Sequence, residues 1–433
     1  MNFFSKTVRL SALVVLGAVL IFEVGCGDTF RPIASPLVSP SGNPGIFGTL
    51  TIINCNGTTS RSGPLSNCSG TLGSNSQMID VAGDVVTAVG NIGLTPGFTG
   101  YDATRLAFFV PNAAADSVTS VSYSVDSVTA LYVAQPTVLT VPAGSNPVAT
   151  FIGSAEEYVL NAGSGTVCPN LSVIAIATNA VTSSYCVGTT PVFGVQTGSN
   201  VFVLDKTLNQ VNVYSPQQQK FVASIAVGTT PVFAVSSYDG NFVYVVNQGS
   251  SDISIIDANA LTVVGTVPTG GSGPIKAVLD RTLIRLYVVN QGDNSVTVFN
   301  ALGNSTLTQL GKAIVGPAPV DLTILTGGAR AFTANSGNNT LTEINTGSFT
   351  TSTVVVGTDP AALVTDVASS TDGTKLYASS VTAGNLNNGV TVFRTSDRVA
   401  VTKLLAPKQD PNCVTTASST CALQQPQQIL GGR

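Results

Sequence analysis

The residues of this chain that could carry chemistry are its cysteines, its few carboxylates and a series of regularly spaced Asn and Asp residues. The 433-residue sequence contains no histidine and no tryptophan. Without histidine the chain lacks Ser-His-Asp and Cys-His catalysis, the commonest general base and the commonest zinc ligand. Beyond residue 25 the glutamates are Glu156, Glu157 and Glu343. The adjacent pair would point to opposite faces of a strand, which does not suit a glycosidase.

Other site signatures are also missing from the sequence. It has no Asp-x-Asp-x-Asp-Gly calcium loop and no Gly-Lys-Ser/Thr phosphate loop. A formal charge of −4, without a basic stripe, argues against nucleic acid as a partner. We therefore predict no metal, no cofactor and no nucleic-acid partner, and we favour a protein that is not an enzyme.

The chain has seven cysteines, and an odd number in an exported protein leaves at least one cysteine outside any internal disulfide. Lys6 and Arg9 precede an uninterrupted apolar run over residues 10–22, which is too short to span a bilayer comfortably. Val24-Gly25-Cys26-Gly27 then resembles a bacterial lipoprotein lipobox, with Glu23 where Leu is usual. We predict a signal peptide over 1–25 and acylation of Cys26, so that a lipid anchors the protein in the bacterial envelope, facing periplasm or exterior. The alternative is ordinary signal cleavage, which leaves Cys26 as a thiol.

The six other cysteines predict disulfides in an oxidising compartment. Six cysteines allow fifteen connectivities, and we favour pairing by proximity. For the middle pair there is a geometric reason, because the start of one hairpin strand lies beside the end of the next. The expected bridges are Cys55–Cys68, Cys168–Cys186 and Cys413–Cys421.

From about residue 81 the chain repeats itself. A proline after a Gly-rich turn recurs seven times at spacings of about 40 to 50 residues, and an aromatic residue followed three positions later by Asn or Asp recurs with it. The prolines are Pro96, Pro147, Pro191, Pro231, Pro274, Pro319 and Pro360. Within one repeat, 232–236, 242–247, 252–257 and 261–267 each have the pattern of a strand. The sequence predicts an all-β, seven-bladed β-propeller with four-stranded blades.

The segments around the repeats have other compositions. Residues 26–45 carry a proline at every fourth position and are expected to form an extended tether. We expect an irregular capping region over 46–80, the propeller over 81–407 and a C-terminal tail with a small disulfide loop over 408–433. Both 80–90 and 398–404 resemble fourth strands, so one of them is expected to be an extra or edge-covering strand.

The repeated polar positions allow two interpretations. On one face of the disc they would form a polar rim for a ligand or cation. Alternatively each side chain caps its own turn, which Asn and Asp do well, and a feature found in nearly every blade favours this structural role. The residues are Asn112, Asn161, Asp205, Asn247, Asn290 and Asn335, with Ser380 in the seventh repeat.

Five stretches resemble the YVTN family of β-propeller repeats: Asn241-Phe-Val-Tyr-Val-Val-Asn247, Arg285-Leu-Tyr-Val-Val-Asn290, Thr371-Asp-Gly-Thr-Lys-Leu-Tyr377, Asn294-Ser-Val-Thr-Val-Phe299 and Asn388-Gly-Val-Thr-Val-Phe393. The likeness covers roughly residues 96–407 and is weaker in the first repeat, which is also longer. It implies a seven-bladed propeller of the kind found in exported or surface-associated proteins of bacteria and archaea. It implies no particular reaction.

Two functions remain open. The first is a non-catalytic, membrane-anchored binding or scaffolding module for a protein, glycan or envelope component, whose specific surface comes from the long first repeat and the 381–388 insertion. The second is a lactonase-like hydrolase or lyase with its site at the central channel, because propellers host both. Carboxylates and an arginine meeting in the channel would favour the second.

Overall fold

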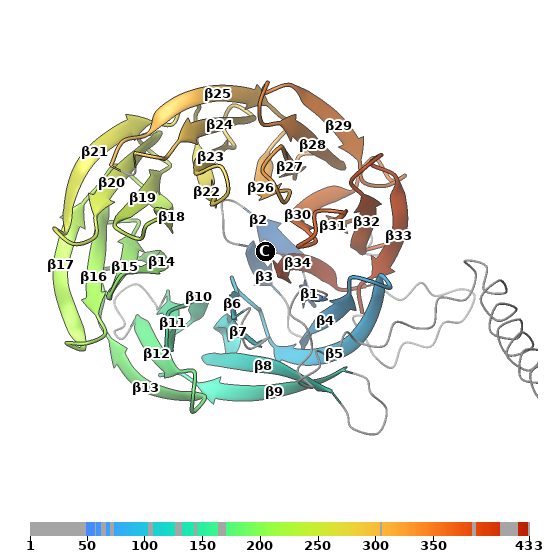
Figure 1. Ribbon diagram of the computed structural model, residues 1–433. Coiled ribbons are helices and arrows are strands. Elements are labelled where there is room, and N and C mark those ends of the chain that lie inside the picture. The colour runs from blue at the N-terminus through green and yellow to red at the C-terminus, as the bar shows by residue number, and fades with distance from the viewer. Residues whose placement is uncertain are drawn as a thin grey trace, which may run out of the picture.

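The computed structural model is a ring of eight four-stranded sheets around a central channel (Figure 1). It describes residues 49–56, 58–61, 66–69, 73–102, 107–125, 132–142, 145–162, 170–303, 305–382, 387–407 and 423–431. The predicted all-β propeller with four-stranded blades is confirmed. The predicted number of seven blades is wrong, because the ring contains one more.

The blades are numbered here in chain order, and each is given from its innermost to its outermost strand. Blade 1 consists of β34 (Gln425–Gly431), β1 (Thr49–Cys55), β4 (Ser74–Asp80) and β5 (Val85–Gly93). Blade 2 consists of β6 (Gly100–Asp102), β7 (Ala107–Asn112), β8 (Ser117–Val125) and β9 (Tyr132–Thr140), and blade 3 of β10 (Pro147–Ile152), β11 (Glu156–Asn161), β12 (Leu171–Ala175) and β13 (Ala180–Tyr185). Blade 4 consists of β14 (Pro191–Thr197), β15 (Asn200–Asp205), β16 (Gln210–Ser215) and β17 (Lys220–Ala226), and blade 5 of β18 (Pro231–Ser236), β19 (Phe242–Asn247), β20 (Asp252–Asp257) and β21 (Thr262–Pro268). Blade 6 consists of β22 (Pro274–Asp280), β23 (Arg285–Asn290), β24 (Ser295–Asn300) and β25 (Thr308–Ile314). Blade 7 consists of β26 (Pro319–Ile324), β27 (Arg330–Asn335), β28 (Thr340–Asn345) and β29 (Thr351–Val355), and blade 8 of β30 (Leu363–Ser369), β31 (Lys375–Val381), β32 (Gly389–Arg394) and β33 (Ala400–Leu405).

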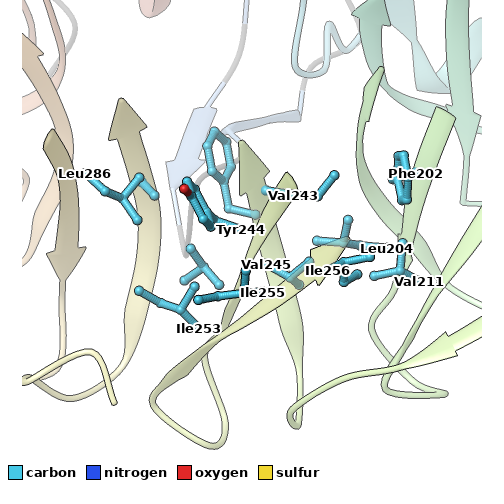
Figure 2. Packing of buried hydrophobic residues seen from close by; sticks show 14 of the residues in the cluster. Phe202, Leu204, Val211, Val243, Tyr244, Val245, Ile253, Ile255, Ile256 and Leu286 are labelled. Carbon is cyan, nitrogen blue, oxygen red and sulfur yellow. The ribbon is translucent and has the colours of Figure 1, made fainter. Parts of the chain in front are cut away.

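The middle strands of each blade are covered on both faces by neighbouring blades. A strand in that position has a continuous apolar run rather than an alternating pattern. In β19, Val243, Tyr244, Val245 and Val246 are each 0% exposed. Figure 2 shows Val243, Tyr244 and Val245 among residues of β15, β20 and β23. The outermost strand β21 contains no buried residue: its first three residues are exposed, and partly buried and exposed residues alternate after them.

The ring closes by joining the two ends of the chain in blade 1. Strand β34 pairs antiparallel with β1, with Ile429 opposite Ile52. The expected capping region over 46–80 therefore contains two blade strands, and the expected tail over 408–433 contains the innermost strand of that blade. Both the 80–90 and the 398–404 segments contain fourth strands, β5 and β33, which belong to different blades.

A small hairpin is inserted between β1 and β4. It consists of β2 (Thr58–Arg61) and β3 (Ser66–Ser69), and both strands contact β34. Figure 1 shows it near the middle of the ring, beside β34. The predicted Cys55–Cys68 disulfide is present and ties this hairpin to the end of β1.

Helical structure among the described residues is limited to a 3-10 turn, η2 (Ala113–Ala115). In that part of the chain no helix has the length and hydrophobicity needed to cross a membrane.

Candidate binding site in the central channel

The innermost strands of all eight blades enclose a cavity of about 580 Å³. This volume lies within the range of small-molecule sites, roughly 300–1,000 Å³. The cavity residues extend along the channel to Ser236 and Arg281, which lie at the end of β18 and just after β22. Arg281 is exposed, so this end of the cavity reaches solvent.

A shift in pairing register that recurs in the innermost strands identifies the residues at the other end of the cavity. In β14, β18, β22 and β26 the pairing register shifts between the first residue, a proline, and the second residue after it. The same shift occurs in β10, β30 and β34. A register shift of this kind changes the direction of the side chains beside it, and here it occurs at the equivalent position of each of these strands. The equivalent residues, here called the channel ring, are Phe98, Ala149, Phe193, Phe233, Lys276, Asp321, Asp366 and Gln428. All of them except Ala149 line the cavity.

The half of the channel ring from blades 2 to 5 is apolar. The Phe193 and Phe233 rings are stacked with centroids 4.2 Å apart, and Phe98 meets Phe193 edge to face at 5.8 Å. One level further along, the ring of Phe151 lies against Gly194, where a Cβ atom would be 2.3 Å from it. These four phenylalanines all line the cavity.

The other half of the channel ring is polar and charged. Lys276 forms an ion pair with Asp321, and their side chains are 13% and 7% exposed. The Asp321 carboxylate also accepts a hydrogen bond from the backbone N–H of Leu322 at 2.7 Å. A pair this buried requires both partners, because an isolated charge is costly away from water.

Asp366 and Gln428 complete the polar half and connect the closing blade to its neighbours. Asp366 accepts hydrogen bonds from the backbone N–H groups of Val367 at 2.9 Å and Ile429 at 2.8 Å. Gln428 accepts from the Thr99 N–H at 3.0 Å and donates to the Thr99 carbonyl at 3.3 Å. These side chains therefore hold β34 between blades 8 and 2 while they border the cavity.

The six Asn and Asp residues of the repeats do not form an open rim. Their side chains are 0% exposed, except for Asp205 at 1%. Asn290 donates to the hydroxyls of Ser295 at 3.2 Å and Thr297 at 3.0 Å, and equivalent bonds occur in other blades. Asp205 accepts from the N–H groups of Thr207 and Leu208, both at 3.0 Å. Their burial leaves little surface for a ligand rim: the asparagines bond to hydroxyls of the following strand, and Asp205 caps its own turn.

The glycine in the turn that precedes each innermost strand explains why Asn or Asp recurs at the end of the second strand. A Cβ at Gly316 would lie 2.4 Å from the Asn335 Nδ2 atom. A Cβ at Gly271 would be equally close to the side chain of Asn290. In blade 8, where Ser380 takes the place of Asn, a Cβ at Gly357 would meet nothing within 4 Å. The turn and the amide are thus packed as a unit.

Several predicted features lie outside the described residues. These are the signal segment, the tether with Cys26, and Cys168, Cys413 and Cys421. Cys186 is disulfide-bonded. At the edge of the 381–388 insertion, Asn388 is buried and accepts from the Thr382 N–H at 2.7 Å, so this part of the expected binding surface is internal.

Sequence reasoning missed the channel ring. Its signal was the second position after the repeat proline, which is Phe193, Phe233, Lys276 and Asp321 in four successive repeats; in the next repeat Val364 stands where the proline would be, so Asp366 carries no such signal. Side chains that differ between otherwise similar repeats are the ones free to serve a specific site.

Residues 197–324 match the family model described as Lactonase, 7-bladed beta-propeller. This match covers well under half of the chain, and the ring it belongs to here has eight blades. No curated protein matches the sequence.

Solved propeller structures are similar in fold. The dihydro-heme d1 dehydrogenase NirN in complex with DHE has a TM-score of 0.63 at 11% identity, covering 89% of this chain and 76% of that one. Apo AztD from Citrobacter koseri has a TM-score of 0.60 at 13% identity, covering 89% and 98%. A putative 6-phosphogluconolactonase from Bacteroides uniformis has a TM-score of 0.53 at 14% identity, covering 71% and 96%. Identities this low indicate a shared fold, not a shared function.

Proposed function

We propose that this chain is an exported, lipid-anchored binding protein whose ligand occupies the central channel without being chemically changed. The observation that carries the proposal is the cavity itself, with phenylalanines on one half of the channel ring and hydrogen-bonding groups on the other. Ligand sites have this composition, mostly apolar with a few placed polar groups. The cavity favours a small organic ligand over the protein or glycan expected at the disc faces.

The bonding of the charged groups supports binding rather than hydrolysis. Lys276 and Asp321 are bonded to each other, and Asp366 accepts from two backbone amides. A general base must reach the proton it removes and must have a pKa near the working pH. Groups that already hold the ring together are poorly suited to that task, and the chain has no histidine to replace them.

Export and anchoring are part of the proposal and rest on the sequence. The basic start, the apolar run and Cys26 support a lipoprotein signal. The Cys55–Cys68 disulfide supports an oxidising compartment.

The second candidate is a lactonase-like hydrolase. It is favoured by the family match over 197–324, a segment that includes Phe233, Lys276 and Asp321 from the channel ring. Two carboxylates also line the cavity, as an enzyme of this kind would require.

A substitution that blocks the cavity distinguishes the binding function from the hydrolase function. Val235 lines the cavity in β18, whereas Val264 in β21 of the same blade is 49% exposed. The mature Cys26→Ser chain, Val235→Trp and the matched control Val264→Trp are screened by thermal shift against amines, aromatics, sugars, peptides and lactones, and lactone hydrolysis is measured in parallel.

We expect stabilisation by some compounds in the parent chain and in Val264→Trp, loss of it in Val235→Trp, and no lactone turnover. Turnover that disappears in Val235→Trp would establish the hydrolase instead. A screen in which no compound binds the parent chain would overturn the proposed function.

A further inference from the structure

We propose that Tyr185 and Tyr214 form an oxidative modification site, at which a one-electron oxidant joins the two rings through a carbon–carbon bond to give dityrosine. The bond would tie blade 3 covalently to blade 4. This inference goes beyond the proposed function and does not depend on what the channel binds.

Both tyrosines depart from the pattern of the repeats. Tyr185, opposite Leu171 in blade 3, occupies a position that is aliphatic in blades 4 to 8. The residues there are Ile225, Val267, Ala313, Val354 and Leu404. Tyr214, opposite Val201 in blade 4, is replaced by isoleucine or phenylalanine in blade 3 and in blades 5 to 8. Those residues are Ile174, Ile256, Phe299, Ile344 and Phe393. Packing at the two positions therefore requires no hydroxyl group.

The two departures meet at the contact between the blades. The ring centroids of Tyr185 and Tyr214 are 4.9 Å apart, and the ring planes are inclined by 47°. The ring of Tyr214 also packs against Tyr158 at 6.2 Å and Phe221 at 5.5 Å. These are favourable separations for aromatic pairs, and neighbours on several sides restrict the orientation of the ring. The two phenols are thus held in contact before any oxidant acts.

The two rings differ in their access to a dissolved oxidant. Tyr214 is 1% exposed, whereas Tyr185 is partly exposed, so the oxidant reaches Tyr185 first. Cys186, the next residue in the chain, is disulfide-bonded and offers no thiol that could reduce a tyrosyl radical. Burial first, and then the neighbouring Tyr185 side chain, raises the pKa of Tyr214, so its ring waits as a neutral phenol.

The coupling takes two one-electron steps. The oxidant, of the class of peroxide-driven haem oxidants or carbonate radicals, takes one electron from Tyr185, whose hydroxyl proton goes to water. The radical then adds through a ring carbon beside its oxygen to the equivalent carbon of Tyr214, which forms the carbon–carbon bond. A second oxidant takes one electron from the adduct, the ring proton of Tyr214 goes to water, and the ring proton of Tyr185 moves to its own oxygen. In total two electrons and two protons leave, and both phenols are restored.

The test oxidises the mature Cys26→Ser chain with illuminated tris(bipyridine)ruthenium and persulfate, which supply a one-electron oxidant. We expect monomeric protein with dityrosine fluorescence and a mass lower by two hydrogen atoms. Peptide mapping should give a cross-linked peptide that contains Tyr185 and Tyr214 and that thiol reagents do not separate.

Three variants assign the cross-link to this pair. Tyr185→Phe and Tyr214→Phe should each lower the dityrosine yield of the monomer about tenfold, and phenylalanine already occupies the position of Tyr214 in blades 6 and 8. The matched control is Tyr238→Phe, which removes a tyrosine that is 50% exposed in blade 5 and should leave the yield unchanged. The cross-linked monomer should also unfold at a higher denaturant concentration than oxidised Tyr185→Phe, because a cross-link restricts the unfolded chain as a disulfide does.

The inference is overturned if the oxidised monomer contains no dityrosine, if tyrosines couple only between two chains, or if Tyr185→Phe keeps the full yield. A cross-link that maps to Tyr158 and Tyr214 would also overturn it, because that pair is farther apart at 6.2 Å. None of these outcomes bears on ligand binding in the channel, so failure here leaves the proposed function standing.

Discussion

Ring closure depends on non-covalent contacts, because β34 follows β33 of blade 8 in the chain whereas β1, β4 and β5 of blade 1 come from residues 49–93. Lys375, at the start of β31, donates to the Val81 carbonyl at 2.6 Å and to Asp84 Oδ2 at 2.7 Å. The hydroxyl of Tyr377 reaches the other carboxylate oxygen of Asp84 at 3.0 Å. We predict that Lys375→Met destabilises the ring at this junction.

The expected loss in the free energy of unfolding follows from how deeply the Lys375–Asp84 ion pair is buried. The side chains of Lys375 and Asp84 are 21% and 10% exposed, so the pair is better shielded from water than a surface pair. Hydrogen bonds to charged groups are worth about 1.5–3 kcal/mol each, and residual exposure reduces that value. Removing the ammonium also leaves a mostly buried carboxylate with less compensation. We expect a loss of about 2 kcal/mol in the free energy of unfolding.

A matched control is available in blade 6. Lys312 also bonds one carboxylate, Asp293, and one carbonyl, that of Gly270. Its pair is 30% and 32% exposed and does not cross the closure. Lys312→Met should therefore cost less than about 1 kcal/mol.

The assay is chemical denaturation of both variants, together with hydrogen exchange of the β34 and β1 amides. Lys375→Met should lower the unfolding midpoint and speed exchange in these two strands, and Lys312→Met should do neither to the same extent. Equal losses for the two variants, or unchanged exchange at β34, would refute the argument that the closure is the weak junction.

Three further predictions concern the anchor, a packed turn and a titrating turn. Cys26→Ser should abolish incorporation of labelled fatty acid and release the protein from membranes, and label in both forms or in neither would contradict acylation at this residue. Gly316→Ala should cost about 1–3 kcal/mol because its Cβ would meet a buried amide, whereas Gly357→Ala, with open space around it, should be nearly neutral; similar losses in denaturation would count against the packed-turn explanation. The Ser370 hydroxyl lowers the pKa of Asp372 against the opposing effect of desolvation, so this carboxylate stabilises the fold above its unfolded pKa and loses that effect as pH falls through the folded one. In Ser370→Ala the carboxyl carbon titration of Asp372 should move up toward the ordinary value, and an unchanged titration would exclude this bond as the cause.

Much of the fold could be predicted from local patterns. The repeat prolines, the Asn or Asp at the end of each second strand and the apolar runs between them all arise within single blades. Gly240 and Gly373, in the turns after β18 and β30, have φ of 73° and 70°, a conformation that favours glycine and marks those hairpins in the sequence. The Cys55–Cys68 disulfide closes a short separation of 13 residues and was accessible to the same local reasoning.

Blade 1, the blade that the repeat count missed, could not be found in this way because its strands come from residues 49–93 and 425–431. Its proline is Pro426 in β34 and its polar partner is Asn54 in β1, so the two markers are hundreds of residues apart. The position three residues before Asn54 is Thr51 rather than an aromatic residue, which removes the second marker. Only the pairing of β34 with β1 joins them.

The sequence by itself determined the blade, because a four-stranded antiparallel sheet is set by short-range turns and by apolar runs buried on both faces. The tertiary structure decided the number of blades and the site. Which residue of an innermost strand faces the axis depends on a register shift after the proline, and which residues meet across the channel depends on how many blades close the ring. Lys276, Asp321 and Asp366 come from three successive repeats and are brought to the same cavity only by the packing of their blades side by side.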